Sequence, residues 1–329
     1  MNRNYRILID GGYFKHMCMA KATESSAEEL TLDDYKSKLA CAFFSLLKQI
    51  SLEYSTYNFF FCLDDNKEKL VRRMIYPDYK LHREIKYKEQ SEEEQEKYKV
   101  LYEYYISLFG ILKKAGFEHV IWCSGFEADD IIAELATTGK DHFNVIVAND
   151  SDLFQLLSDN VQMYNLQSGL YFSPELFKLK YGIDVSRWVE IKSAVGDTAD
   201  NIVGIEGVGD KSYIKYLNGE LPKFTKAKKT NKKFAIIEEC REQVLAVNIP
   251  IVRLPMQRQD LRSQSQLDLY DKFKGILLKH TEDQSIIKES KAYSALADLD
   301  LDSFKHDGFT VALDFFYCAG IIKDKLRGI

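Results

Sequence analysis

Short apolar runs alternate with longer amphipathic stretches along the first half of the chain. The runs are short enough for buried strands and are bounded by turn-forming or acidic residues; they are Tyr5–Ile9, Tyr57–Leu63, Val120–Cys123 and Asn144–Ala148. Apolar residues recur at helical spacing between them, notably in Leu32–Leu52, Lys99–Ala115 and Asp129–Thr137. Alternating strands and helices predict an α/β domain at about residues 1–180, whose mostly parallel central sheet has helices on both faces.

The pattern changes at two places. From Lys80 to about Lys99 the chain is almost all polar, with an acidic run at Ser91–Glu96. This composition fits either a solvated helix or loop, or a mobile charged arch over an active site. The arch would span about residues 76–110, and we expect it to be mobile because it has little apolar surface to bury. The second half has mainly helical patterns, so we assign residues 181–329 to a helical C-terminal domain.

Composition places the chain among globular proteins. Hydrophobic residues make up 46% and charged residues 29%, and no stretch approaches the roughly 18 consecutive apolar residues of a membrane span. The six cysteines lie far apart, which favours reduced thiols over a disulfide framework or a zinc site and predicts a cytoplasmic protein. We expect a monomer with no membrane partner. The net charge of −5 argues weakly against a nucleic-acid partner, and less so if many acids cluster in one metal site.

Acidic residues recur where the predicted strands end and where the following helices begin. They are Asp10, Asp64, Glu127, Asp129, Asp130, Asp150 and Asp152, with a further pair at Asp197 and Asp200. Because ligands of an open parallel sheet bind beyond the carboxyl ends of its strands, these side chains should meet in one crevice. Carboxylates crowded in this way need cations, and oxygen-only ligands suit Mg²⁺ or Mn²⁺ rather than zinc. Two such ions roughly 4 Å apart can promote phosphodiester hydrolysis.

Each of these acids also has an ordinary structural interpretation. Asp10 precedes Gly11 and Gly12 and could be a turn residue. Asp129 and Asp130 could be favoured at a helix start by the helix dipole, and the Asp197 pair could be N-caps. Capping does not explain their joint placement at several strand ends, which favours the metal site.

Three acidic segments resemble the motifs of the 5′ nuclease superfamily, which includes flap endonucleases. They are Glu127–Ile132, Ala148–Leu156 and Val195–Ile202, and they follow an opening strand that ends at Asp10. The chain length, the arch position and the ending at Phe315–Ile321 look closest to the phage 5′-3′ exonucleases called phage RNase H, which would place the protein in the host cytoplasm. The resemblance implies a first metal held by Asp10, Asp64, Glu127 and Asp129, and a second surrounded by Asp130, Asp150, Asp152, Asp197 and Asp200. Asp65 is the alternative to Asp64.

The base of the predicted arch, Tyr76–Arg83, resembles the Tyr-Lys-x-x-Arg segment of this family. The resemblance implies that Lys80 and Arg83 are catalytic and face the scissile phosphate. They lie one helical turn apart and could stabilise charge on the phosphate, although a surface basic pair is the alternative. Tyr79 is a candidate for stacking on a base near the cut.

The glycine-rich turn at Gly204–Gly209 resembles the helix–hairpin–helix element of the same nucleases, here at about residues 190–220. The implied DNA-binding residues are Gly204, Gly207, Val208, Gly209 and Lys211. Glycines allow the backbone to approach a phosphate, and the next helix can bind it with its N–H groups. Family members often hold a monovalent cation in this turn, which makes K⁺ a candidate. The lysine-rich stretch Lys223–Lys233 is either a solvated loop or a contact to a duplex backbone.

The resemblance implies a structure-specific 5′ nuclease, a 5′-3′ exonuclease or flap endonuclease that removes RNA primers or 5′ flaps in replication and repair. Its substrate would be a DNA or RNA–DNA duplex with a free 5′ end, flap or nick, and its partners would include a single-strand-binding protein or clamp. The sequence leaves two rivals: a non-catalytic duplex-DNA-binding accessory protein, and a PIN-type ribonuclease. The ribonuclease would lack both the arch and the helix–hairpin–helix.

Overall fold

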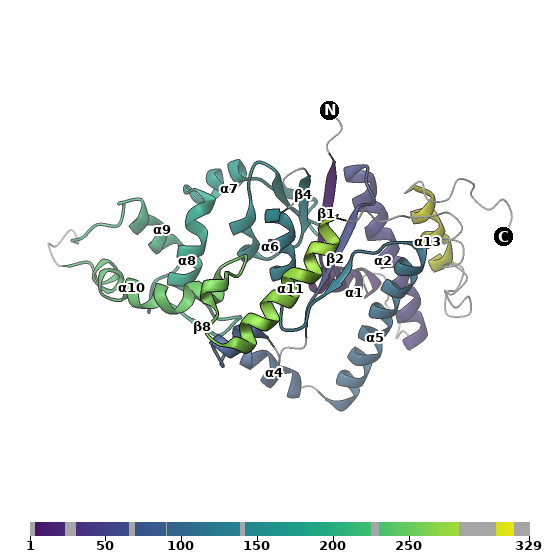
Figure 1. Ribbon diagram of the computed structural model, residues 1–329, viewed down its shortest axis with the longest axis horizontal. Coiled ribbons are helices and arrows are strands. Elements are labelled where there is room, and N and C mark those ends of the chain that lie inside the picture. Colours follow the sequence, from purple (N-terminus) through teal and green to yellow (C-terminus); the bar gives the residue numbers. More distant parts are fainter. Residues whose placement is uncertain are drawn as a thin grey trace.

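The computed structural model describes residues 4–23, 31–65, 70–89, 91–138, 142–224, 230–282 and 307–318. A six-stranded sheet in the order β3-β2-β1-β4-β5-β6 lies at its centre (Figure 1). The strands are β1 (Tyr5–Asp10), β2 (Phe59–Leu63), β3 (Val120–Trp122), β4 (Phe143–Val147), β5 (Val161–Asn165) and β6 (Leu170–Phe172). Neighbouring strands from β3 to β5 pair in parallel, and β6 is antiparallel to β5.

The predicted fold class is confirmed, and the four predicted strands are present with ends shifted by one or two residues. The sequence analysis did not identify β5 and β6. The three residues of β6 are too few to show a period of two, and the first two are exposed. A short edge strand of this kind gives no apolar run for sequence analysis to detect.

Two hydrophobic cores lie on opposite faces of the sheet, because successive side chains of a strand point to opposite sides. In β1, Ile7 and Ile9 contact one core and Leu8 contacts the other. The first core is covered by α1 (Gly11–Thr23), α2 (Leu32–Tyr54), α5 (Glu92–Ala115) and α13 (Asp307–Cys318). The second is covered by α6 (Ala128–Thr138), α7 (Pro174–Tyr181), α8 (Trp188–Val195), α10 (Lys232–Val252) and α11 (Gln264–Glu282).

The polar stretch after Lys80 forms two helices, α4 (Leu81–Lys88) and the N-terminal part of α5. Ser91 is the N-cap of α5 and forms a capping box with Glu94, while Glu92 and Glu93 lie in the first turn, where the helix dipole favours acids. The acidic run is therefore a helix start. The predicted helix began only at Lys99, because apolar residues recur at helical spacing from there on. The mobility of this segment stays a prediction.

The C-terminal helices pack on the sheet domain. Phe315 and Phe316 of α13 are buried against Phe44 of α2, and α11 contacts α6. Figure 1 shows α13 beside α2, at the opposite end of the molecule from α9 (Asp210–Leu217) and α10. The expected division at residue 180 thus separates helices that share the cores of the sheet. The part of the predicted ending beyond Cys318 lies outside the described residues.

Two further expectations concern the helices and the cysteines. None of the helices within the described ranges is long and apolar enough to span a bilayer. All six cysteines are free thiols, as their spacing predicts, and Cys18, Cys62 and Cys123 are buried.

Candidate active site

The predicted acids meet where the order of the strands reverses, between β1 and β4. Chain connections run from β1 outward through β2 to β3 on one side, and through β4 to β5 on the other. Such a switch point leaves a crevice beyond the carboxyl ends of the strands. A pocket of about 360 Å³ lies there, and its lining includes five acids and two basic side chains: Asp10, Asp64, Glu127, Asp129, Asp150, Lys80 and Arg83.

Asp10 and Asp64 each use one carboxylate oxygen to cap a helix. Oδ1 of Asp10 accepts hydrogen bonds from the N–H groups of Gly12 (2.8 Å) and Tyr13 (3.1 Å). Oδ1 of Asp64 accepts one from Ala128, at the start of α6 (2.9 Å). A Cβ at Gly12 would lie 3.3 Å from both Asp10 Oδ1 and Asp64 Oδ2, so glycine leaves the space between the two acids open. Asp10 thus caps the start of α1, where a turn residue was the structural alternative, and it also lines the pocket.

Asp64, and not Asp65, faces the pocket. Asp65 is buried, and its Oδ2 accepts a hydrogen bond from the backbone N–H of Gly125 at 2.6 Å. The Asp65 side chain thus holds the loop before α6. This arrangement favours Asp64 of the two candidates for a metal ligand.

Crowding raises the pKa of several acids in and beside the pocket. Burial, and then the neighbouring Asp64, raises the pKa of Asp10 to about 7. Burial and the charges of Asp150 and Asp10 raise the pKa of Asp129 well above its ordinary value. Burial and Asp150 raise the pKa of Asp152 to about 6. Each shift means that the charged carboxylate is unfavourable here unless a cation accompanies it.

Glu127 differs from these acids, because basic side chains surround it. Burial alone would raise its pKa, but Lys80 and Arg72 lower the pKa to about 2. Lys80 Nζ lies 2.5 Å from Glu127 Oε1, and Arg72 Nη1 lies 3.2 Å from Oε2. The backbone of Lys80 has φ of 56°, and its N–H donates to the Asp200 carbonyl oxygen. This left-handed turn directs the lysine from the arch base into the pocket.

Two predicted residues lie elsewhere than expected. Asp130 is buried on the far side of Glu127, where its Oδ2 accepts hydrogen bonds from Arg72 Nη1 (2.5 Å) and from the Glu127 N–H (3.0 Å). The structure does not bring it to the pocket. Tyr79 is 4% exposed, and its hydroxyl donates to Glu127 Oε2 at 2.8 Å. Its ring is packed among apolar side chains, so stacking of Tyr79 on a base stays a prediction that requires the ring to leave this position.

The remaining acids form two ion-pair groups at the edge of the pocket. Lys192 of α8 lies between Asp152 (2.9 Å) and Asp197 (3.0 Å) and joins them. Asp197 Oδ1 also accepts a hydrogen bond from the Ala199 N–H in the turn between β7 and β8, where no helix begins, so its interpretation as a helix N-cap is wrong. Asp200 pairs with Arg83 at 2.6 Å and lies 3.6 Å from Lys80. The arch base is thus held to the loop that follows α8.

Within the described residues, no group of three or more acidic, histidine or cysteine side chains is already arranged to hold a metal ion. Basic groups stand among the carboxylates instead. Neither Arg72 nor Lys192 was predicted from the sequence to belong to the site. Arg72 lies in the otherwise apolar run Leu70–Ile75, and a basic pair in such a run is a usable signal of a buried partner. Lys192 gives no such signal, because a lysine on a helix is ordinarily solvated.

A two-stranded ribbon and a glycine-rich turn connect α8 to α9. The ribbon strands are β7 (Gly196–Asp197) and β8 (Ile202–Val203). A Cβ on Gly204 would lie 2.0 Å from the Val195 carbonyl oxygen, so this glycine permits close packing of the turn on α8. Val208 is buried in the second core, so its side chain cannot reach DNA.

The other predicted residues of this turn face open space. A Cβ on Gly207 or Gly209 would meet nothing within 4 Å, although Gly207 has φ of 71° and is favoured there for its backbone. Lys211 is exposed in the first turn of α9. Of the lysine-rich stretch, Lys226, Lys228 and Lys229 lie outside the described residues.

Comparisons with known proteins agree with this geometry. A model of the 5′-3′ exonuclease family, for its N-terminal resolvase-like domain, matches residues 6–182. The chain is 34% identical over 149 residues to a thermostable DNA polymerase I of Thermus thermophilus, covering 44% of this chain and 17% of the polymerase. It is 31% identical over 150 residues to a 5′-3′ exonuclease of Buchnera aphidicola, covering 45% of this chain and 48% of that protein. The chain thus spans less than half the length of either relative.

Solved structures share the fold. A flap endonuclease of bacteriophage T5, crystallised in a complex with DNA and metal ions, superposes with a TM-score of 0.66 at 23% identity. The superposition covers 85% of this chain and all of that one. A T5 5′-exonuclease with bound zinc gives a TM-score of 0.65 at 23% identity, covering 84% of this chain and 99% of its own. At this level of identity the likeness establishes the common fold.

Proposed function

Because the chain belongs to the 5′-3′ exonuclease family, whose resolvase-like domain covers more than half of it, we propose that it is a structure-specific 5′ nuclease. It would hydrolyse phosphodiester bonds near the 5′ end of a nicked or flapped duplex, with a DNA or RNA 5′ strand. The observation that carries the proposal is the pocket at the strand switch point, where five carboxylates face Lys80 and Arg83. The DNA and metal ions bound to the T5 flap endonuclease support the same substrate and cofactor class.

The donor set fits divalent cations. The pocket acids offer oxygen ligands only, and the raised pKa of Asp10 and of Asp129 reflects charge that a cation would neutralise. Such ions would be held by the pocket acids Asp10, Asp64, Glu127, Asp129 and Asp150. Asp152 and Asp197 would contribute if their ion pairs with Lys192 were broken. When bound, Mg²⁺ or Mn²⁺ would neutralise the crowded carboxylates and the phosphodiester and activate water for hydrolysis.

The basic residues of the arch base would orient the scissile phosphate and act mainly on the cleavage step. Lys80 lines the pocket, and its ammonium group donates a hydrogen bond to Glu127. Arg83 also lines the pocket, and its side chain is 42% exposed. A phosphate that enters the pocket would offer both groups a competing anionic partner. Lys80 and Arg83 would then stabilise the negative charge that builds on the phosphate oxygens during hydrolysis.

The turn after β8 would hold the duplex. Gly207 and Gly209 have open space around their Cα atoms, so a phosphate could approach the backbone N–H groups at the start of α9, where Lys211 adds a positive charge. These contacts read no bases, which suits recognition by structure. K⁺ at this turn, as implied by the resemblance, remains a prediction.

Cleavage of a 5′-labelled flap duplex, with Mg²⁺ and with EDTA, tests the proposal. We expect short labelled products near the junction with Mg²⁺ and none with EDTA. Asp129→Asn should bind the same duplex in EDTA with wild-type affinity and release no product with Mg²⁺, whereas Asp159→Asn, an exposed acid in a distant turn, should cleave normally. Salt-sensitive binding without any Mg²⁺-dependent cleavage by the wild-type protein would leave the non-catalytic DNA-binding alternative.

A further inference from the structure

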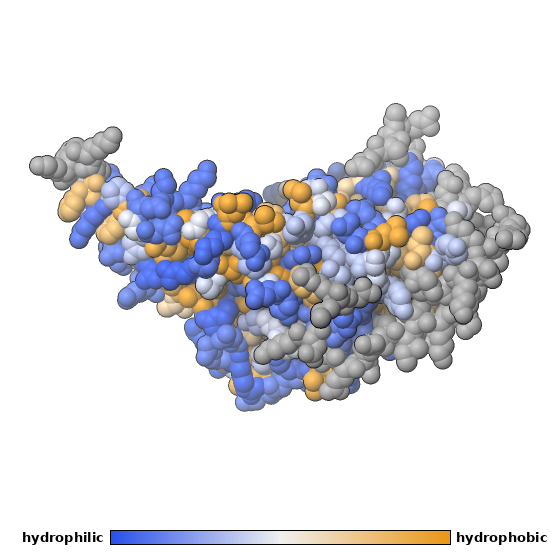
Figure 2. Space-filling model, turned by 90° about the horizontal axis from the view of Figure 1, so that it is seen from above, coloured by the Kyte–Doolittle hydropathy of each residue, from blue (hydrophilic) through white to orange (hydrophobic). Residues whose placement is uncertain are grey.

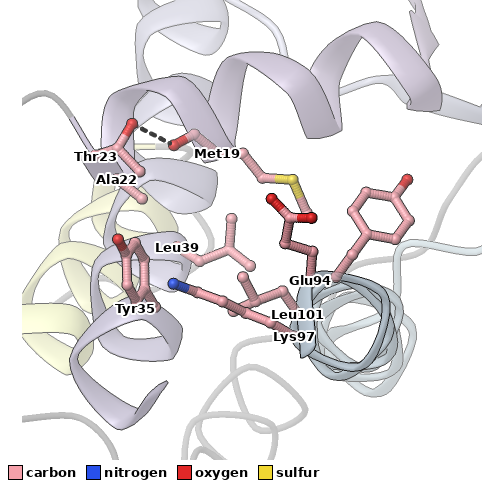
Figure 3. Close-up of a pocket in the computed structure, with 9 residues that line it drawn as sticks. Met19, Ala22, Thr23, Tyr35, Leu39, Glu94, Lys97 and Leu101 are labelled. Carbon is pink, nitrogen blue, oxygen red and sulfur yellow. Dashed lines mark hydrogen bonds between the residues drawn. The ribbon is translucent and has the colours of Figure 1, made fainter. Parts of the chain in front are cut away.

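A second pocket lies between α1, α2 and the N-terminal half of α5. Its volume is about 390 Å³, which is within the range of small-ligand sites. The residues that line it come from the three helices (Figure 3): Met19, Ala22 and Thr23 from α1, Tyr35 and Leu39 from α2, and Glu94, Lys97 and Leu101 from α5. Tyr98 completes the lining. The walls are mostly apolar and aromatic, and the two charged residues, Glu94 and Lys97, both come from α5.

Exposed aromatic rings connect this pocket to the catalytic one. Tyr98 and Tyr102 lie one turn apart on α5, with parallel rings whose centroids are 6.3 Å apart. Their exposed fractions are 42% and 39%, so both rings are partly open to solvent. Tyr98 lines the second pocket, and both rings lie against the ammonium group of Lys15 in α1.

Lys15 of α1 stands between the two pockets. Its ammonium donates a hydrogen bond to the Tyr98 hydroxyl (2.7 Å) and lies 4.8 Å from the centre of the Tyr102 ring. Tyr13, two residues before it in α1, and His16, the residue after it, line the catalytic pocket. A positive charge and two exposed rings therefore form a continuous surface that begins beside the catalytic acids.

The chemistry of this surface selects its ligand. Lysine beside stacked tyrosines suits a nucleic acid strand, whose phosphates pair with the ammonium while its bases stack on the rings. Inside the pocket, the Lys97 ammonium lies 4.3 Å from the centre of the Tyr35 ring, and the Glu94 carboxylate offsets its charge, so the lining as a whole does not favour a phosphate. A flat, uncharged aromatic group fits this lining better than an anion does.

We infer that the pocket between α1, α2 and α5 binds an unpaired nucleobase of the 5′ single strand, guided there by Lys15, Tyr98 and Tyr102. The inference rests on the proposed nuclease function and adds a site that holds the displaced strand. A duplex without an unpaired 5′ tail cannot use this site. Tailed substrates should therefore gain affinity from it, and untailed ones should not.

Dissociation constants measured in EDTA, where cleavage is blocked, test the inference. For Tyr98→Ala we expect about tenfold weaker binding of a duplex with a 5′ tail, since one base–aromatic stack contributes on the order of 1–3 kcal/mol. Binding of the untailed nicked duplex should change less than about twofold by the same reasoning. Tyr171→Ala removes a comparably exposed tyrosine on β6 and serves as the control, with no expected change on either duplex.

Two substrate variants show whether the bases or the sugar–phosphate backbone of the tail contribute the affinity, and whether the 5′ tail or a 3′ tail does so. A 5′ tail with an intact sugar–phosphate chain and no bases should bind the wild-type protein as weakly as the normal tail binds Tyr98→Ala. Equal binding of the two tails by the wild-type protein would overturn the inference. A loss of affinity in Tyr98→Ala that is confined to a 3′-tailed duplex would overturn it as well. If Mg²⁺-dependent cleavage persists while Tyr98→Ala and Tyr102→Ala bind tails normally, the pocket assignment fails and the nuclease function stands.

Discussion

The Arg72 guanidinium and the Asp130 carboxylate form a buried ion pair beneath the active-site pocket, with Nη1 2.5 Å from Oδ2. Arg72 also donates to Glu127 and, through Nε, to the carbonyl oxygen of Ile251 at the end of α10. One buried arginine thus links the helix before the arch, the start of α6 and the C-terminal helices. Asp130 supports the pocket through this contact.

Adjacent acids of α6 should therefore respond differently to neutralisation. Asp130→Asn should destabilise the protein by about 3 kcal/mol, because loss of one partner leaves the buried Arg72 charge poorly compensated. Asp129→Asn should leave stability unchanged or raise it, since burial and the neighbouring acids disfavour the Asp129 charge. Denaturant unfolding without metal, paired with the flap-cleavage assay, measures both effects.

Activity should follow the opposite order. We expect Asp129→Asn to lose at least about 100-fold in cleavage rate, because it removes a ligand expected for the metal that promotes hydrolysis. Folded Asp130→Asn should retain more activity than Asp129→Asn. Equal stability of the two variants would show that the Arg72 pair contributes little, and equal loss of activity would return Asp130 to the set of ligands.

Divalent cations should stabilise the folded protein. The acids of the pocket repel one another, and a ligand bound only to the folded state adds about 2.7 kcal/mol at a concentration 100 times its dissociation constant. The melting temperature should rise with Mg²⁺ or Mn²⁺ and fall back on addition of EDTA. Asp10→Asn should reduce this rise and Asp159→Asn should preserve it. An equal rise with NaCl at the same ionic strength would show that screening, not a site, is responsible.

The sequence was sufficient to predict the parallel sheet and the meeting of the acids, because both follow from local rules. Apolar runs mark the buried strands, and the carboxyl ends of parallel strands share one edge, so Asp10, Asp64 and Asp150 had to lie close together. Which acids face the pocket could not be predicted. Asp129 and Asp130 are neighbours on one helix, and only the packing of Arg72 from another element decides which of them turns inward.

Surface chemistry that depends on tertiary packing was equally inaccessible from the sequence. Tyr79 lies beside Lys80 in the motif, and the sequence gives no reason to bury one ring and leave those of Tyr98 and Tyr102 exposed. Figure 2 shows a comparable case: apolar residues are exposed over the part of the molecule where α7 lies, and Leu179 of α7 is 83% exposed. The spacing of apolar residues in the sequence locates a helix, but the elements packed against that helix determine which of its sides stays exposed.

Loss of the Lys80 ammonium should reduce the cleavage rate more than it reduces DNA binding. We expect Lys80→Ala to cleave about 100- to 1,000-fold more slowly in single turnover, the usual loss when a group that stabilises transition-state charge is removed. Arg83→Ala should lose less, because its side chain is 42% exposed and solvent screens its charge. Binding of the flap duplex in EDTA should change little for either variant. A Lys80→Ala protein that cleaves at the wild-type rate would exclude the lysine from catalysis.

Two glycines of the turn after β8 should separate folding from DNA binding. Gly204→Ala would place a Cβ 2.0 Å from the Val195 carbonyl oxygen, so the backbone must shift, and we expect a loss of about 1–3 kcal/mol in unfolding free energy. Gly209→Ala meets no atom within 4 Å and has φ of −112°, so the fold should tolerate it. If a phosphate approaches the N–H groups there, the added methyl group will weaken duplex binding while the melting temperature stays unchanged. A phosphate bound at the start of α9 would clash with a methyl group at position 209. Unchanged affinity of Gly209→Ala for an untailed duplex would therefore place the duplex contact elsewhere on the protein.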